Sequence, residues 1–238
     1  MKTLDLHIGF DTRQPLSFQV FRNSLERQSS AALHIRPLMQ KALRHEGLYR
    51  REQILKQGQS WDVISGAPMS TEFAITRFLV PHLQRTGWCM FGECDMLALA
   101  DIAGLFSLAD DRYAVMCVQH EHHVYTLRSK MDGRMQLDYP RKNWSSLMLI
   151  NADHPGNRRL TVEMVNTLPG RYLHRFCWLD DAEIGALPVE WNYLVGEQMP
   201  DVVPKLLHFT NGTAETTQPR WLDEALRVRR FPIAESVA

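Results

Sequence analysis

The sequence predicts a single α/β domain built on a mostly parallel mixed sheet that helices flank. The chain opens with a strand, a helix and a second strand within about 35 residues, which is the order of a right-handed crossover unit in nucleotide-binding domains. A short apolar run at residues 88–91 suits a strand buried on both faces of such a sheet. The 238 residues are 45% apolar and 23% charged, which is ample material for a core, and no clear linker divides them.

Each element of the opening unit has its own signal. Residues 4–10 alternate as a strand does, and Pro15 then opens a helical stretch with apolar residues at helical spacing. Residues 32–38 form the second expected strand, and Pro37 places it near a sheet edge. Asp11 follows the first strand, where a base or ribose contact is expected, although a turn or N-cap aspartate is the better explanation from the residues alone.

The following stretch, residues 43–65, is polar and irregular. It is expected to be a loop with one helix, of a length often found in lids. Ser70 or Thr71 is expected to cap the next helix, which carries Phe73 and other apolar residues into the core. Arg77 is the one strong charge in the middle of this helix. An arginine there can reach a phosphate bidentately, whereas a solvated helix face is the default interpretation.

The most informative stretch follows the apolar run, where Gly92 precedes Glu93, Cys94 and Asp95. Residues two apart in extended chain point the same way, with α-carbons roughly 6.5–7 Å apart, so Glu93 and Asp95 aim two carboxylates at one point. Open α/β sheets bind ligands beyond the carboxyl ends of their strands, and paired carboxylates suit Mg²⁺ or Mn²⁺ with phosphate oxygens. A solvated acidic turn is the alternative interpretation. The pattern favours a metal-dependent enzyme acting on a nucleoside diphosphate.

The second half of the chain continues the alternation of strands and helices. His120 and His122 invite a metal interpretation, but no second ligand motif accompanies them, so they are expected to line a pocket wall or face solvent. His208 ends the last apolar strand and matters for a site only if that strand returns to the carboxylates. The remaining expectations are a helix from Asp101, strands at 113–118, 147–151 and 205–209, a helix from His154 to about Leu168, a loop at 130–142 and no assigned element from residue 218.

Composition excludes several classes of protein. Lys and Arg together number 27, as do Asp and Glu, so the net charge is zero and nucleic acid is not an expected partner. The four cysteines are scattered without a CxxC motif and indicate reduced thiols in a cytoplasmic protein. The polar start is unlike a signal peptide, and no run approaches the length of a membrane span.

The order of these elements resembles that of the glycogenin-like glycosyltransferases, family 8 in the usual classification, and of their small bacterial members with the GT-A fold. The resemblance extends over nearly the whole chain to about residue 212, and it rests on the shared order and spacing of several short motifs. These motifs are TRFLVP with Arg77, Glu93-Cys94-Asp95 at the D-x-D position, the helix with Asp101, Ile102, Leu105 and Phe106, WSSLMLIN at 144–151, Asp180-Asp181, LPVEWN at 187–192 and HFTNG at 208–212.

The resemblance implies a metal-dependent glycosyltransferase that moves a sugar from a nucleotide sugar, with a UDP-sugar the expected donor, and retains the anomeric configuration. Mn²⁺ or Mg²⁺ is the implied cofactor. The enzyme domain is expected over 1–215, followed by a tail at 216–238. The implied metal ligands are Glu93, Asp95 and His208, the donor-binding residues are Phe10, Asp11, Arg77, Lys130 and Gly212, and the catalytic residues are Asp180, Asp181 and Arg77.

The chain departs from the family pattern in three places. Glu93 replaces the first aspartate of D-x-D, and Trp144 stands where the family commonly has asparagine. The family's Lys-Pro-Trp after Gly212, whose lysine binds the diphosphate, is not matched. Neutralisation of the diphosphate therefore falls to the metal, Arg77 and a loop residue such as Lys130 or Arg220.

Two other functions compete with glycosyl transfer. A nucleotidyltransferase or sugar-nucleotide pyrophosphorylase shares the fold class, but its glycine-rich loop after the first strand is missing from Gly9-Phe10-Asp11-Thr12-Arg13. A non-catalytic module that binds nucleotide sugars is consistent with the missing lysine and with Glu93. The acceptor (a saccharide, a lipid-linked sugar, a protein or a small molecule) and the oligomeric state are not encoded in any motif.

Overall fold

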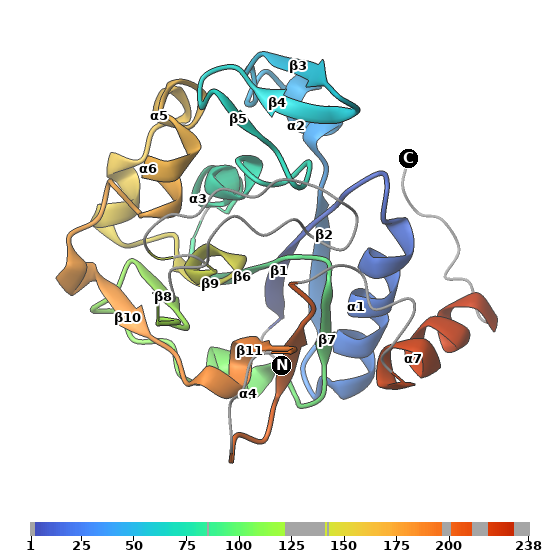
Figure 1. Ribbon diagram of the computed structural model, residues 1–238. Helices are drawn as coiled ribbons and strands as arrows, with labels where there is room; N and C mark the ends of the chain where they lie inside the picture. The colour runs from blue at the N-terminus through green and yellow to red at the C-terminus, as the bar shows by residue number, and fades with distance from the viewer. Residues whose placement is uncertain are drawn as a thin grey trace.

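The computed structural model describes residues 3–84, 86–121, 141, 143–196, 201–210 and 219–230. Figure 1 shows a central sheet with helices around it and a small sheet at the top of the view. At the right, α7 (Pro219–Arg230) lies beside α1 (Pro15–Gln28). This is the mixed α/β architecture that the sequence predicts.

Six strands form the central sheet in the order β10-β8-β9-β6-β1-β2. Their bounds are β1 Leu4–Gly9, β2 Leu33–Leu38, β6 Trp88–Gly92, β8 Val115–Cys117, β9 Leu147–Asn151 and β10 Ile184–Ala186. β9 runs antiparallel to both of its neighbours, and the other pairings are parallel. Pro37 lies in the edge strand β2, as predicted, because an edge strand tolerates a residue without a backbone N–H. The parallel strands end at one edge of the sheet, so residues that follow β1 and β6 meet there.

Aromatic rings close over both faces of the sheet next to two glycines. A Cβ on Gly92, at the end of β6, would lie 3.1 Å from the ring of Phe21, which α1 contributes. A Cβ on Gly9, at the end of β1, would lie 2.5 Å from the ring of Phe73. Gly92 pairs with Ile8 and therefore lies on the same face of the sheet as Ile8. Successive residues of a strand face opposite sides, so Gly9, which follows Ile8, lies on the other face.

The helix expected from Ser70 or Thr71 begins later than predicted. The ordered turns are η1 (Thr76–Leu79), a 3-10 helix, and α3 (Val80–Leu83). The residues before them are held at the end of β1 instead: the Arg13 guanidinium donates to the Ser70 carbonyl over 3.0 Å, and the Glu72 N–H donates to Asp11 over 3.2 Å. These contacts keep the segment out of a helix.

A second sheet of three strands and a second hydrophobic cluster join the C-terminal part of the chain to α1. The sheet has the order β11-β12-β7, with β7 Met96–Ala98, β11 Tyr193–Leu194 and β12 Leu206–His208. The cluster includes Val20 of α1, Leu207 of β12 and Trp221 of α7. No element was expected from residue 218, so α7 corrects that expectation, because Trp221 is buried against α1 and β12 and fixes the helix there.

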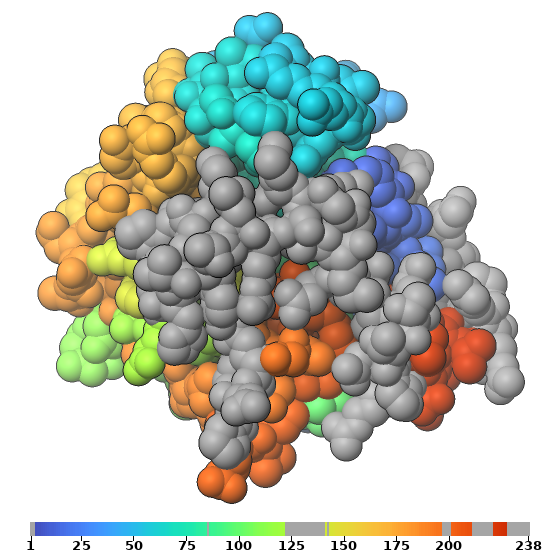
Figure 2. Space-filling view, in the orientation of Figure 1, coloured from blue at the N-terminus to red at the C-terminus, as the bar shows by residue number. Residues whose placement is uncertain are grey.

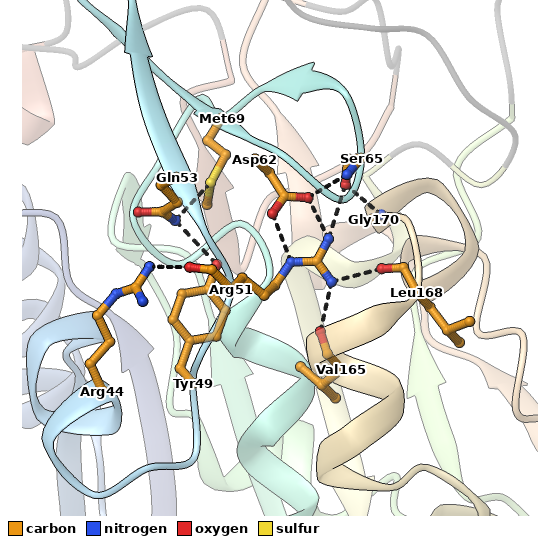
Figure 3. Close-up of polar contacts among 10 residues, drawn as sticks. All are labelled: Arg44, Tyr49, Arg51, Gln53, Asp62, Ser65, Met69, Val165, Leu168 and Gly170. Atoms are coloured by element: carbon orange, nitrogen blue, oxygen red, sulfur yellow. Dashed lines mark hydrogen bonds and ion pairs between the residues drawn. The ribbon is translucent and has the colours of Figure 1, made fainter.

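A third sheet corrects the expected loop at residues 43–65. The strands β3 (Gln53–Lys56), β4 (Gln59–Asp62) and β5 (Ala67–Pro68) form an antiparallel sheet after α2 (Gln40–His45). Figure 2 shows this sheet as a prominence at the top of the molecule. Arg51, which is fully buried, anchors it by bonds to Asp62 and to two carbonyls near α5 (Val162–Thr167), as Figure 3 shows.

The other elements are short. The helix expected from His154 to Leu168 is divided into a 3-10 helix, η3, and α5, because Leu160 at the junction is extended. The remaining bounds are α4 Ala103–Phe106, η2 Trp144–Ser146, η3 Pro155–Arg159, α6 Gly170–His174, η4 Asp181–Glu183 and η5 Val189–Asn192. Among the described residues, every helix is too short or too polar to span a membrane.

Candidate metal centre and donor site

Three metal-ligating side chains that are distant in sequence meet at the carboxyl edge of the central sheet. Glu93 and Asp95 follow β6, and the chain then enters β7, whose Met96 pairs with His208 of β12. His208 Nε2 lies 3.4 Å from Glu93 Oε2 and 3.6 Å from Asp95 Oδ1. One ligand atom from each residue lies within 4.8 Å of the others. The sequence predicted these three residues as metal ligands, and the structure brings all three together.

Asn192 holds the His208 ring in the orientation that a metal ligand needs. His208 Nδ1 donates to Asn192 Oδ1 over 2.9 Å, and Asn192 Nδ2 donates to Ser146 Oγ over 2.9 Å. This bond leaves the lone pair of His208 on Nε2, which is buried and has no hydrogen-bond partner among the described residues. A hydrogen bond of this kind, from the distal nitrogen of a ligating histidine, is typical of protein metal sites. The donor set, with two carboxylates and one imidazole, therefore fits a divalent cation.

Arg77 lies inside the protein, although the sequence predicted a contact with phosphate. Its side chain is 4% exposed, and its Nη1 lies 2.6 Å from Glu93 Oε1. The same nitrogen donates to the carbonyl of Ser145 over 2.9 Å, and Nε donates to the carbonyl of Phe73 over 3.3 Å. The guanidinium carbon also lies 5.1 Å from the centroid of the Phe91 ring. Arg77 therefore belongs to the wall behind Glu93.

Asp11 organises the turn after β1. It is fully buried, and its carboxylate accepts hydrogen bonds from the backbone and side chain of Arg13 and from the Glu72 N–H. Burial alone would raise the pKa of Asp11, but the hydrogen bonds and charge of Arg13 lower it below its ordinary value. Phe10 packs edge to face on Phe18, with 5.4 Å between ring centroids. The side chain of Asp11 thus acts on the turn itself, and Arg13 is the residue that it positions.

A pocket of about 440 Å³ opens beside this turn. Its walls come from the turn after β1, from α2, from the small sheet β3-β4-β5 and from the residues before η1. Its lining includes Thr12, Arg13, Gln40, Arg44, Leu55 and Glu72. The side of the pocket near Gln53 and Met69 adjoins the buried network around Arg51 (Figure 3). The pocket combines amide, hydroxyl and guanidinium groups with an apolar wall, which suits a small polar ligand with one flat or apolar face.

Asp180 and Asp181, the predicted catalytic pair, lie away from the three candidate metal ligands. Asp180 precedes η4 and Asp181 begins it, directly before β10. The Ala114 N–H donates to the Glu183 carbonyl where β8 and β10 both start. That is the edge opposite the carboxyl end of β6. Asp181 is 87% exposed on its side chain and pairs with Arg141 over 2.5 Å. The structure therefore does not bring this pair together with Glu93, Asp95 and His208.

The remaining predicted residues complete the comparison. Lys130 and Gly212 lie outside the described residues. His120 follows β8 and is half-buried; burial, and then the nearby His208, lower its pKa to about 4. Asn192 ends the LPVEWN motif, and the sequence alone assigns it no role. Its signal is its place at the end of that motif, but only the tertiary structure shows that its partner is His208.

Solved structures with a similar fold are glycosyltransferases. GlyE of Streptococcus pneumoniae TIGR4 superposes with a TM-score of 0.60 at 12% identity over 95% of this chain and 61% of GlyE. The galactosyltransferase LgtC, solved with donor and acceptor sugar analogs, gives 0.58 at 12% identity over 94% of this chain and 96% of LgtC. The bifunctional glycosyltransferase WbbM gives 0.55 at 13% identity over 89% of this chain and 46% of WbbM. The chain spans about half of the length of WbbM and about three fifths of the length of GlyE.

The fold of this protein is that of the GT-A-type glycosyltransferases. No family model matches the chain. The chain is 46% identical to Protein CDI of Arabidopsis thaliana over 219 residues, which cover 89% of this chain and 79% of that protein. It therefore belongs to the family of Protein CDI.

Proposed function

We propose that this protein is a metal-dependent glycosyltransferase that takes a sugar from a nucleotide sugar, with a UDP-sugar the expected donor. The observation that carries the proposal is the convergence of Glu93, Asp95 and His208 at the carboxyl edge of the sheet. Ligands of open α/β sheets bind at this edge. The fold shared with GlyE and LgtC supports the reaction class, and the resemblance to family 8 enzymes supports retention of configuration.

The three residues would hold Mn²⁺ or Mg²⁺. When bound, the ion supplies a Lewis acid that neutralises negative charge on the diphosphate leaving group. Asp95 and Glu93 would provide hard oxygen ligands, and His208 would provide a nitrogen ligand that Asn192 orients. Because Arg77 pairs with Glu93, its positive charge offsets part of the negative charge of that carboxylate.

We place the nucleoside of the donor in the pocket beside the turn after β1. Glu72 lines this pocket and Arg77 follows it by five residues, so one short segment joins the pocket to the carboxylate cluster. The volume of about 440 Å³ suits a nucleoside. Arg13, which Asp11 fixes, would contact the nucleoside there, and the Thr12 hydroxyl, which donates to Glu72, would offer it an acceptor. Asp180 and Asp181 lie at the opposite edge of the sheet and are not part of this proposed site, whereas Lys130 and Gly212 remain predicted donor contacts.

The experiment that tests the function is donor hydrolysis without an acceptor. The protein is incubated with a panel of nucleotide sugars, with and without Mn²⁺, and release of the nucleoside diphosphate is measured. We expect Mn²⁺-dependent release from one donor. Asp95→Asn should abolish the release without changing the folded state, because the amide is a poorer ligand for a hard cation.

The matched control is Asp110→Asn, the same change at a half-exposed residue before β8 that pairs with Arg112, and it should release nucleoside diphosphate as the parent protein does. Absence of release from every donor, together with no Mn²⁺-dependent thermal shift by a nucleoside diphosphate, would leave a non-catalytic module of the same fold. Release of pyrophosphate from a nucleoside triphosphate and a sugar phosphate would identify a pyrophosphorylase instead. The acceptor, the boundary of the domain at residue 215 and the cytoplasmic location remain predictions from the sequence.

A further inference from the structure

Glu93 makes two different contacts with its two carboxylate oxygens. Oε1 lies 2.6 Å from Nη1 of Arg77, and Oε2 lies 3.4 Å from Nε2 of His208. One oxygen therefore faces the buried guanidinium, and the other faces the cluster proposed to hold the metal. The side chain spans the distance between them.

Arg77 cannot move toward a shorter partner. Two backbone carbonyls, of Ser145 and Phe73, accept from its guanidinium over 2.9 Å and 3.3 Å. The Phe91 and Phe73 rings lie 5.1 Å and 5.5 Å from the guanidinium carbon, and the side chain is 4% exposed. A cation fixed in this way sets where the carboxylate opposite it must lie.

We propose that Arg77 is a positioning residue for Glu93, and that position 93 of this protein requires glutamate because an aspartate cannot reach Arg77 and the metal cluster together. This inference rests on the proposed function. An aspartate is shorter by one methylene, about 1.5 Å of chain. If it kept the bond to Arg77, its other oxygen would withdraw from His208, and if it kept its place in the cluster, Arg77 would remain as a buried cation without its carboxylate.

The inference explains the departure from D-x-D at residue 93. It also gives Arg77 a role other than a direct contact with the diphosphate. The change that restores the usual aspartate of the motif should therefore weaken the site, which is the opposite of what motif similarity predicts.

The test is the affinity for Mn²⁺ alone, measured from the electron paramagnetic resonance signal of the free ion, with no nucleotide present. The variants are Glu93→Asp, Glu93→Gln and Arg77→Lys, each checked for folding by circular dichroism. We expect Glu93→Asp and Arg77→Lys to bind Mn²⁺ about tenfold more weakly than the parent protein, a size typical for loss of a supporting contact around a metal ligand. The double variant Glu93→Asp with Arg77→Lys should bind Mn²⁺ about as weakly as either single variant, because Arg77 acts through Glu93.

Each outcome decides a different statement. Parent-like Mn²⁺ affinity, within about twofold, in Glu93→Asp or in Arg77→Lys would overturn the positioning role while leaving the metal site intact. A parent protein that takes up no Mn²⁺ would overturn the metal site and this inference with it. Should Glu93→Asp fail to fold, Arg77→Lys still decides the question, because it keeps Glu93 and the positive charge at residue 77 and the inference expects it to lose affinity.

Discussion

His208 and Asn192 form a hydrogen bond of 2.9 Å between Nδ1 and Oδ1, both at buried positions. The bond joins η5 to β12, and its two residues are 16 positions apart in the sequence. Because Asn192 can only accept through Oδ1, it selects the His208 tautomer whose Nε2 lone pair faces Glu93 and Asp95. The metal affinity of the site should therefore depend on Asn192, a residue that would not itself contact the ion.

Asn192→Ala should weaken Mn²⁺ binding by about 10- to 100-fold, because it frees the ring of His208 and removes the acceptor that fixes its tautomer. Titration with Mn²⁺ measures the change. Asn157→Ala is the matched control, since Asn157 is also buried and hydrogen-bonded, but to the Ala114 and Asn151 carbonyls rather than to a ligand. Equal losses of Mn²⁺ affinity in both variants would show that general destabilisation, and not the tautomer, is responsible.

Each of the three candidate metal ligands has a local signal in the sequence. Glu93 and Asp95 follow an apolar strand at alternate positions, and His208 ends another apolar strand. Their meeting depends on the antiparallel register of β7 and β12, which pairs Met96 with His208 and has no signature in either strand alone. The resemblance to a family supplied that step.

Arg77 shows what local patterns cannot decide. A charged residue in an apolar helical stretch is consistent with a phosphate contact, a solvated face or a buried ion pair. The guanidinium points inward because the Ser145 carbonyl, in η2, accepts from it and the Phe91 ring, in β6, lies beside it. Both partners are distant from Arg77 in the sequence. Asp180 and Asp181 illustrate the same limit, because a motif fixes their order in the chain but not the sheet edge at which they lie.

The missed elements had weaker signals for physical reasons. β3 and β4 have four residues each, β3 is largely exposed, and their few apolar residues do not alternate as those of a half-buried strand do. The anchor of their sheet, Arg51, is a charged residue that sequence reasoning places at the surface. The sequence of α7 has a partial helical signal, because Trp221 and Ala225 are four residues apart, as two residues on one helix face are. Both are buried in the structure.

Removing the α7 contact should destabilise the protein. Trp221 is 1% exposed and packs with Val20 of α1 and Leu207 of β12, next to His208. Trp221→Ala should lower the free energy of unfolding by about 3–5 kcal/mol, as large-to-small core changes do. Urea unfolding followed by circular dichroism measures the difference.

Leu222 provides the control on the same helix, because it is adjacent in sequence but 37% exposed. Leu222→Ala should cost no more than about 1 kcal/mol. If Trp221→Ala were as mild as Leu222→Ala, the residues from 219 onward would be dispensable, as a tail is. The Mn²⁺ affinity of Trp221→Ala, measured well below its unfolding midpoint, would show whether the second cluster also supports β12.

The buried ion pair of Arg51 and Asp62 should be a second sensitive point. Their side chains are 0% and 2% exposed, and the guanidinium also donates to the Val165 and Leu168 carbonyls over 2.8 Å and 2.7 Å. Burial alone would raise the pKa of Asp62, and the hydrogen bonds from Arg51 lower it below its ordinary value. Arg51→Met leaves Asp62 buried without its cation and should cost about 3–5 kcal/mol of unfolding free energy.

Two comparisons separate the ion pair from the side-chain volume. Arg50→Met removes a neighbouring pair with Glu163 that is 56% and 68% exposed, and it should cost no more than about 1 kcal/mol. The double variant Arg51→Met with Asp62→Leu should be more stable than Arg51→Met alone, because no buried charge remains. A double variant that is less stable than the single one would mean that Arg51 acts chiefly through the two carbonyls.

Acid should unfold this protein earlier than carboxylate titration alone predicts. Burial lowers the pKa of His7 from 6.5 to about 4, and burial together with the Arg77 charge lowers that of His174 from 6.5 to about 3. Below pH 6.5 the unfolded chain binds protons at both residues, while the folded chain does not. The stability from their neutral forms is complete above pH 6.5 and is lost as the pH falls toward 4 and 3, with a slope of ~1.4 kcal/mol per pH unit for each histidine.

The measurement is the free energy of unfolding in urea at several pH values between 7.5 and about 4.5, a window set by this linkage. His174→Gln should have a pH slope smaller by ~1.4 kcal/mol per unit near pH 5, whatever its stability at pH 7.5. His45→Gln, at an exposed residue of α2, should leave the slope as it is. Parallel curves for the parent protein and His174→Gln would mean that His174 gains a proton in the folded chain, and hence that the Ser145 hydroxyl and the surrounding rings admit an imidazolium beside Arg77.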